Sequence, residues 1–274
     1  MIDELDYKER LLINGKLDES CTDKYINTVI RILDKNKKEV FKGNNKVILS
    51  GSEFLTLKLF NLGSNTFTTP SYNTQLDLDN SQLNTGNDLS DSYKVFLFAM
   101  GTSGCAMGSQ IKYEVSTKKW IDPKDLVPFR YRSIGSDLDD VNRRIYYGRK
   151  EDTTIGKISY YFKRFDSEPV LTREFEDGTP WSSSVYSDDS ALKANTRVSL
   201  VAKVNENDGR EYFNDTIGIT NARFNCIELL LGWPYVVNGY TYYQDIRPFT
   251  RLNFPNRPLS ELGDSYEIIY DLYF

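Results

Sequence analysis

The stretch that decides the fold is residues 247–274, RPFTRLNFPNRPLSELGDSYEIIYDLYF. Its last seven residues are β-branched, aromatic or otherwise apolar, and only Asp271 interrupts them. Such residues favour strands, and a segment this apolar has little reason to stay in solvent. We therefore predict a C-terminal strand held in a sheet or against a partner, with no catalytic role. The residues expected to pack there are Ile268, Ile269, Tyr270, Tyr273 and Phe274.

Upstream, short apolar or alternating runs are separated by turn signals, a pattern typical of strands. The predicted strands are 26–32 with 39–41 as a hairpin, 93–100, 145–147, 158–165, 197–204, 224–231 and 235–243. A helix over 25–33 is the alternative to the first of these. A helix is also expected after Ser52, a good N-cap residue, with Gly63 closing it. Residues 64–92 are rich in Ser, Thr, Asn and Asp and predict a long surface loop.

Strands at this spacing predict a mainly β protein, a β-sandwich or jelly-roll-like pair of sheets with one or two short helices. We expect an N-terminal arm over 1–20 and a first β-rich half over 21–120 with a short helix and the long polar loop. The proline-containing segment 121–128 would lead into a second β-rich half over 121–274, which ends in the C-terminal strand. One continuous domain is the alternative.

Composition narrows the class of protein. A net charge of −5 and a pI of about 5.1 provide no overall field that attracts nucleic acid. No apolar run approaches the length of a membrane span, and the charged N-terminus has no apolar signal core. We therefore expect a soluble protein that is made inside a cell and needs no membrane.

The chain contains no histidine, which excludes histidine general bases, histidine metal ligands and both histidine-dependent nucleophile arrangements. Cys21, Cys105 and Cys226 are far apart in the sequence and predict buried free thiols rather than a disulfide framework or a zinc site. Lysine, carboxylate or tyrosine chemistry stays open. We expect no enzyme and no cofactor.

Two kinds of motif invite a ligand interpretation. The glycine-rich run 101–108 follows a predicted buried strand but lacks the Gly-Lys-Ser/Thr ending of a phosphate loop, so a tight turn is expected. The acidic clusters at 77–80 and 137–140, and more weakly 205–211, place alternating oxygen ligands in turns. None has the glycine and distal glutamate of a calcium-binding EF-hand loop, so solvated turns are expected and Ca²⁺ is the alternative.

A basic and aromatic stretch runs from 129 to 150, FRYRSIGSDLDDVNRRIYYGRK. Arginine and tyrosine are enriched at protein–protein contacts, and acidic residues interrupt the run, so protein contact is favoured over nucleic acid. The tyrosine-rich 240–243 segment, expected to be a turn, has the same character. The predicted contact residues are Arg130, Tyr131, Arg132, Arg143, Arg144, Tyr146, Tyr147, Tyr240, Tyr242 and Tyr243.

Several segments together resemble virion structural proteins of large tailed bacteriophages. They are NKVILSGSEFLTLKLF, LVPFRYR, IYYGRK, YYFKRFDSEP, NARFNCIELLLGW, TRLNFPNRPL and IIYDLYF. That group similarly ends in an aromatic strand after an Arg-x-x-Phe-Pro turn, here 251–255.

The resemblance implies a non-enzymatic, oligomeric adaptor in the tail, baseplate or neck, located in the virion and bound to other virion proteins and to copies of itself. The N-terminal arm and the 64–92 loop would become ordered on assembly. The alternatives are a capsid-associated protein, a glycan- or receptor-binding module using Trp181, Trp233 and Tyr235, and a carboxylate-based hydrolase.

Overall fold

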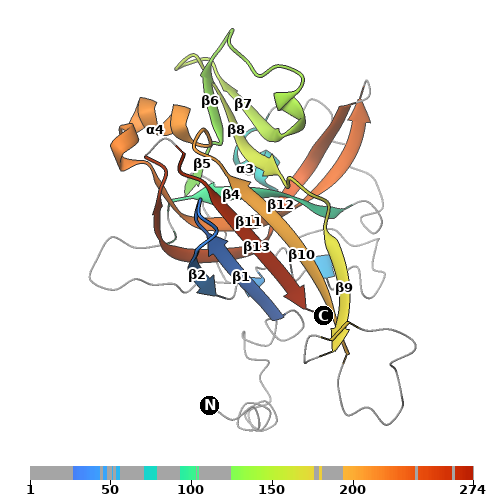
Figure 1. Cartoon of the computed structure of the whole chain (residues 1–274). Helices are drawn as coiled ribbons and strands as arrows, with labels where there is room; N and C mark the ends of the chain where they lie inside the picture. Colours follow the sequence, from blue (N-terminus) through green and yellow to red (C-terminus); the bar gives the residue numbers. More distant parts are fainter. Residues whose placement is uncertain are drawn as a thin grey trace, which may run out of the picture.

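A computed structural model describes residues 27–43, 46–47, 51, 54–55, 71–78, 93–102, 104, 125–175, 179–180, 194–237, 240–260 and 263–273. The strands form two antiparallel sheets (Figure 1), which confirms the predicted mainly β fold. The smaller sheet contains, in spatial order, β2 (Glu39–Gly43), β1 (Asn27–Leu33), β13 (Tyr266–Tyr273), β10 (Ala194–Val204) and β9 (Val170–Phe175).

The larger sheet has eight strands. Its main path is β3 (Lys46–Val47), β12 (Tyr240–Pro258), β11 (Arg223–Val237), β4 (Lys94–Gly101), β8 (Lys157–Arg164) and β6 (Arg130–Ser133). Off this path, β5 (Leu126–Val127) pairs with β4, and β7 (Tyr146–Asp152) pairs with β8. The described helices are α3 (Tyr72–Gln75), α4 (Arg210–Thr216) and the 3-10 helices η3 (Asn142–Arg144) and η4 (Ile219–Asn221).

The C-terminal run is a strand in the middle of the smaller sheet. β13 pairs with β1 on one side and β10 on the other, and Ile268 and Tyr270 are fully buried. The one charged residue of the run, Asp271, lies on the other face, where Arg31 Nη2 (3.2 Å) and Ser199 Oγ (2.6 Å) donate to it from the neighbouring strands. The run is therefore part of the fold's core. Ile269 is half-buried, Tyr273 ends the strand, and Phe274 lies outside the described residues.

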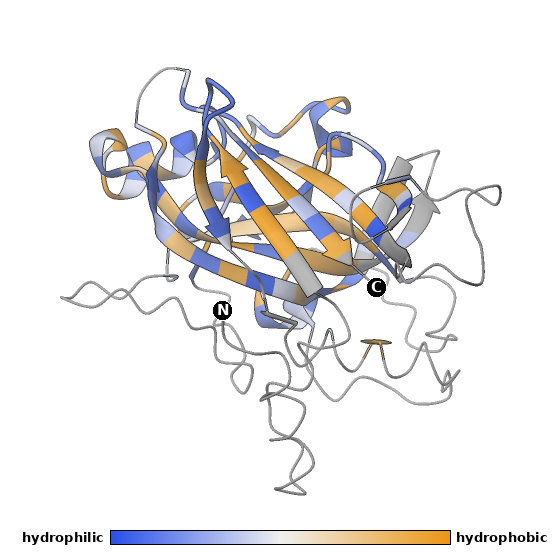
Figure 2. Ribbon diagram, turned by 60° about the horizontal axis from the view of Figure 1, so that its bottom comes forward, coloured by the Kyte–Doolittle hydropathy of each residue, from blue (hydrophilic) through white to orange (hydrophobic). Residues whose placement is uncertain are grey.

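The main hydrophobic core joins the two sheets. Tyr270 and Ile268 from the smaller sheet share one buried cluster with Phe98, Ile227 and Phe254 from the larger one. Hydrophobic and hydrophilic residues alternate along many strands (Figure 2), as expected where one face of a sheet packs and the other does not. A second buried cluster, which includes Tyr72, Phe162 and Leu230, covers part of the larger sheet.

The first hairpin is confirmed, and the helical alternative for 25–33 is wrong over the described residues. β1 and β2 pair antiparallel, and Lys37 takes the left-handed conformation (φ 62°) in the turn between them. The predicted strands in 93–100, 145–147, 158–165, 197–204 and 224–231 are also present.

Two predicted turns are wrong. Residues 240–243 are the start of β12, which pairs with β11, so the strand prediction for 235–243 holds at 235–237 and 240–243. The Arg-x-x-Phe-Pro segment 251–255 lies inside β12 as well. Pro255 is tolerated there because it lies where the pairing register between β11 and β12 shifts, between the Phe224–Arg257 and Cys226–Asn253 pairs. The strand therefore continues where the sequence suggests a stop.

The two expected halves interleave in both sheets. β1 from the first half pairs with β13 from the second, and β4 pairs with β11. β5, inside the proposed boundary segment, pairs with β4 in the same sheet, so 121–128 does not separate two units in the described structure. Strands from both expected halves therefore share each of the two sheets.

Part of the predicted surface loop 64–92 is buried. Ser71 caps α3, and Tyr72 and Asn73 pack beneath the surface against the larger sheet. The remainder of the loop other than 71–78, the N-terminal arm and most of the predicted helix after Ser52 lie outside the described residues, although Gly51, Phe54 and Leu55 are helical. Helix α4, which follows the 205–209 turn, was not predicted.

Candidate protein-contact surface

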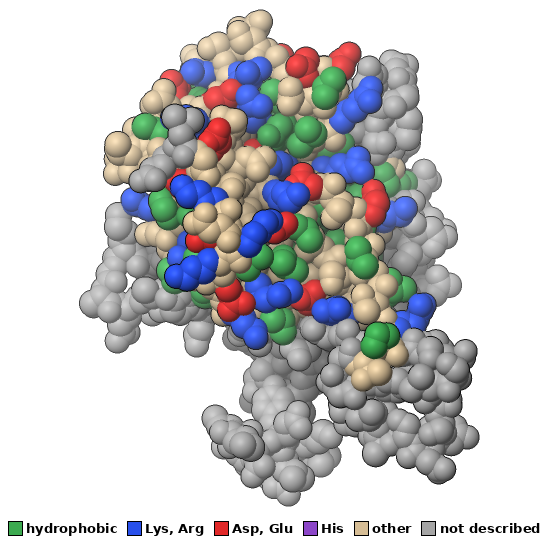
Figure 3. All heavy atoms as spheres, viewed as in Figure 1, with side chains coloured by type: hydrophobic (Ala, Val, Ile, Leu, Met, Phe, Trp, Pro, Cys, Tyr) green, Lys and Arg blue, Asp and Glu red, His purple; other side chains and the backbone are tan. Residues whose placement is uncertain are grey.

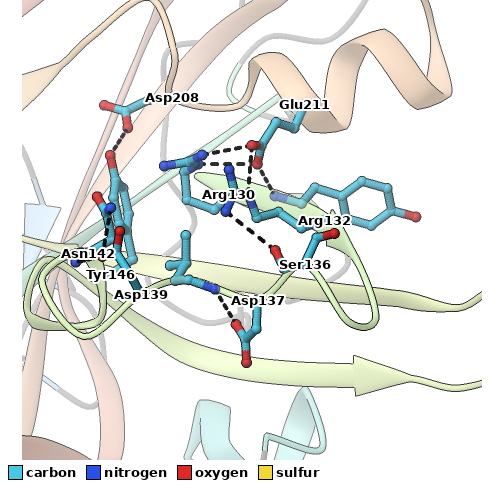
Figure 4. A network of polar contacts seen from close by, with 11 residues as sticks. Arg130, Arg132, Ser136, Asp137, Asp139, Asn142, Tyr146, Asp208 and Glu211 are labelled. Carbon is cyan, nitrogen blue, oxygen red and sulfur yellow. Dashed lines mark hydrogen bonds and ion pairs between the residues drawn. The ribbon is translucent and has the colours of Figure 1, made fainter.

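The arginine–tyrosine stretch forms one end of the larger sheet, where α4 covers the edge strand β6 (Figure 4). Glu211, in the first turn of α4, accepts hydrogen bonds from Arg130 Nε (3.1 Å) and Nη2 (2.7 Å) and from Arg132 Nε (3.0 Å). It also accepts the backbone N–H of Tyr131 (2.9 Å). One carboxylate thus holds the helix against an edge that would otherwise expose its backbone donors.

The ionised form of Glu211 is favoured by these contacts. Burial disfavours the charge, but the hydrogen bonds from Arg130, the Tyr131 N–H and Arg132 outweigh it and lower the pKa of the carboxyl group. Burial alone would lower the pKa of Arg130, but its hydrogen bonds to Glu211 and the charge of that carboxylate outweigh burial and raise the pKa. Arg130 and Arg132, two of the predicted contact residues, are therefore mainly occupied inside the chain.

The hydrogen bonds to Glu211, which we call the Glu211 clamp, hold two tyrosines beside each other at the surface. Tyr131 and Tyr212 meet edge to face with their ring centroids 5.5 Å apart. Lys157 Nζ lies 5.1 Å from the Tyr131 ring centroid and 2.9 Å from Asp215 Oδ2. Both tyrosines are partly exposed, so they offer rigid aromatic area that loses little entropy on binding. We call Tyr131, Lys157, Tyr212 and Asp215 the α4–β6 platform.

Exposed isoleucines lie around the platform. Ile134 is 41% exposed and Ile155 57%, and the two loops touch because the N–H of Ile134 donates to the carbonyl of Gly156 (2.9 Å). Ile217, at the end of α4, is 49% exposed. Scattered single apolar residues are ordinary, but these three adjoin the ends of β6, β8 and α4, which carry the platform, and aromatic with aliphatic side chains is the composition of a protein-contact surface.

A second exposed apolar region lies on β9, at the edge of the smaller sheet. Val170 and Leu171 are 58% and 52% exposed. Neighbouring residues of a strand point to opposite faces, so both faces are open at this point. Within the described part of the chain no strand pairs with the outer edge of β9. Such an edge can accept another strand.

Other predicted contact residues are used inside the molecule. Tyr146 and Tyr147 are 8% and 7% exposed; the hydroxyl of Tyr146 donates to Asp208 and that of Tyr147 to the Arg144 carbonyl. Tyr243 is also buried and meets the Tyr147 ring edge to face. Intramolecular packing covers these three side chains in the described structure, and their contact with a partner stays a prediction.

The remaining predicted residues divide between surface and strand. Arg143 is exposed but paired, since its Nη2 donates to Asp137 Oδ2 (2.7 Å), and Arg144 is exposed in η3. Tyr240 and Tyr242 lie in β12, opposite Val237 and Tyr235 of β11.

The acidic clusters serve local structure in the described residues. Asp137 accepts from Tyr160, Arg143 and Arg149; burial raises its pKa, but these partners and the Leu138 N–H outweigh burial and lower it. Asp139 accepts the N–H of Asn142 at the start of η3. In the residues that the structure describes, no three acidic or cysteine side chains gather as a metal site would require.

The other ligand interpretations fall on packed positions. A Cβ at Gly101 would lie 2.7 Å from Cys226 Sγ, and the N–H of Gly104 donates to Asn225 Oδ1 (2.7 Å), so this part of the glycine run packs closely against β11. Trp233 is partly buried against the core beside Tyr93. Trp181 lies outside the described residues.

Two buried polar clusters were missed by the sequence reasoning. Lys163 and Asp208 form an ion pair between the sheets, and Glu228 pairs with Arg251 while accepting the Tyr72 hydroxyl (2.8 Å). Burial raises the pKa of Glu228, and Arg251 only partly opposes that effect. No residue spacing could reveal these pairs, because their members are far apart in the chain.

Charged side chains of both signs are interspersed on the face shown in Figure 3, as a mixed protein surface would have them. No helix in the described segments has the length and hydrophobicity to cross a membrane. No protein-family model, no curated protein and no solved structure matches the chain.

Proposed function

We propose that the chain is a non-enzymatic structural subunit of a tailed-phage virion, an oligomeric adaptor in the tail, baseplate or neck region. The observation that carries the adaptor role is the pair of exposed apolar surfaces, the α4–β6 platform and the β9 edge. Figure 1 places α4 and β9 on opposite sides of the view, as a part that joins two neighbours requires. The virion assignment rests on the resemblance of the quoted segments.

The two surfaces suit different kinds of contact. The platform offers aromatic side chains on a rigid base, and the exposed Ile134, Ile155 and Ile217 at the ends of its elements add aliphatic ones; together they have the composition of the centre of an interface. The β9 edge offers backbone donors and acceptors together with Val170 and Leu171, which suits addition of a strand from a neighbouring subunit. A capsid-associated position would use the same surfaces.

The test is the solution mass of the full chain by light scattering over a range of concentrations. We expect oligomers, and we expect Ile155→Asp or Leu171→Asp to reduce their mass without unfolding the chain. Val141→Asp is the matched control, because Val141 is 69% exposed but belongs to neither surface. A full chain that stays monomeric at high concentration would refute self-assembly, and a control as disruptive as the two variants would refute the assigned surfaces.

A further inference from the structure

Lys163 and Asp208 are brought together in the interior from different parts of the fold. Lys163 lies on β8 of the larger sheet, and Asp208 lies in the turn that follows β10 of the smaller sheet. Lys163 Nζ is 2.6 Å from Asp208 Oδ2, and the two side chains are 2% and 0% exposed. An amine and a carboxyl group are thus in contact where water has little access.

The surroundings hold both groups in one orientation. Lys163 Nζ also donates to the Lys203 carbonyl (2.7 Å), and the N–H of Asn205 donates to Asp208 Oδ2 (2.8 Å). The Tyr146 hydroxyl donates to the other oxygen, Asp208 Oδ1 (2.9 Å). Nζ also lies 5.7 Å from the Tyr146 ring centroid. Fixed contact between reactants removes most of the entropy cost of joining them.

We propose that Lys163 and Asp208 condense to an intramolecular isopeptide bond that covalently joins β8 of the larger sheet to the turn after β10. Transfer of a proton from Nζ to Oδ2, which lie 2.6 Å apart, yields an amine and a carboxylic acid. The amine can then act as a nucleophile, as desolvated lysines do.

The bond changes balance without any co-reactant. Neutral Nζ attacks Cγ, the C–N bond forms, and the negative charge that develops on Oδ1 is stabilised by the Tyr146 hydroxyl. A second proton passes from nitrogen to the Oδ2 hydroxyl, the C–Oδ2 bond breaks, and water leaves. Nothing is oxidised or reduced, and the product is a secondary amide.

The experiment is the intact mass of the purified, folded full chain, measured after denaturation and followed during incubation. We expect a species lighter than the sequence mass by one water. After tryptic digestion, tandem mass spectrometry should find a branched peptide that joins Lys163 to Asp208, with no cleavage after Lys163. Folded chain that keeps its full mass after prolonged incubation would overturn the proposal.

One competing reaction gives the same mass change. Asp208 precedes Gly209, and an Asp–Gly sequence can lose water to a succinimide. A succinimide is cleaved by hydroxylamine and leaves Lys163 open to trypsin, whereas an isopeptide bond resists the first and blocks the second. A water loss that disappears with hydroxylamine would therefore overturn the proposal as well.

Variants separate chemistry from folding. Lys163→Arg should retain full mass, and Lys42→Arg, at an exposed position of β2, should still lose water. Because Lys163→Arg could fail to fold, Tyr146→Phe is the second variant: it keeps the ring but removes the Oδ1 donor, and should slow water loss at least tenfold in chain whose circular dichroism is unchanged. An unchanged rate in that variant would overturn the role of Tyr146 in the step.

Discussion

Replacing Glu211 with alanine should loosen α4 from β6. It removes four hydrogen bonds and leaves the Arg130 guanidinium, whose side chain is only 14% exposed, without its carboxylate. A hydrogen bond to a charged group contributes about 1.5–3 kcal/mol, but the Glu211 side chain is 29% exposed, so water replaces part of the loss. We expect the free energy of unfolding to fall by about 2–3 kcal/mol.

The measurement is urea unfolding of the wild type and the variant, followed by circular dichroism. Glu168→Ala is the control, since its pair with Arg164 joins side chains that are 69% and 45% exposed and should be worth at most about 0.5 kcal/mol. Glu211→Gln, which keeps one acceptor oxygen, should lie between the two alanine variants.

Acid provides a second check on the same contact. Folding lowers the pKa of Glu211, so its contribution to the free energy of unfolding is present at neutral pH. That contribution is lost as the pH falls from the pKa of the unfolded chain, near 4.5, through the lower pKa of the folded chain. The difference between wild type and Glu211→Ala should therefore shrink in acid. A cost no larger than that of Glu168→Ala, or a difference that is constant with pH, would refute the account of the clamp.

Three further changes test other parts of the fold. Truncation before Tyr266 removes a strand paired on both sides and should abolish cooperative thermal unfolding rather than leave a folded monomer. Gly148→Ala (φ 69°) would place a Cβ 2.4 Å from the Phe162 ring and should lower the free energy of unfolding in urea by more than about 2 kcal/mol. Gly135→Ala (φ 94°), where a Cβ meets open space, should lower it by about 1 kcal/mol. Arg251→Met should cost about 3–5 kcal/mol by leaving Glu228 buried without its cation. Since burial raises the Glu228 pKa, that cost should grow as the pH rises above the unfolded value, near 4.5, in parallel urea titrations.

The strands were largely predictable because their signal is local. β8 and β10 carry alternating or continuous apolar runs of strand length, and the run ending in 268–274 has no polar interruption except Asp271. The prediction of a turn at 251–255 is wrong because it relied on the local proline and arginines. The conformation is decided instead by the pairing of β12 along β11. Tertiary pairing overrode local preference there.

The candidate site was only partly predictable. Arginine and tyrosine in 130–149 correctly mark a polar, aromatic end of the sheet, but composition cannot say which side chains face inward. Tyr146 and Tyr131 belong to the same stretch, yet one is buried over Asp208 and the other lies at the surface against Tyr212. The difference comes from α4 and Asp208, whose positions depend on contacts about 60 to 80 residues away in sequence.

The position of β13 between β1 and β10 also governs how quickly the protein can fold. Arg31 and Asp271, which pair across β1 and β13, are 240 residues apart in the chain, so the smaller sheet closes only after a very large loop has been brought together. The β11–β12 hairpin, by contrast, joins neighbouring segments and can form early. A fold with such a high contact order should refold slowly, with the larger sheet structured first and the smaller sheet completed last.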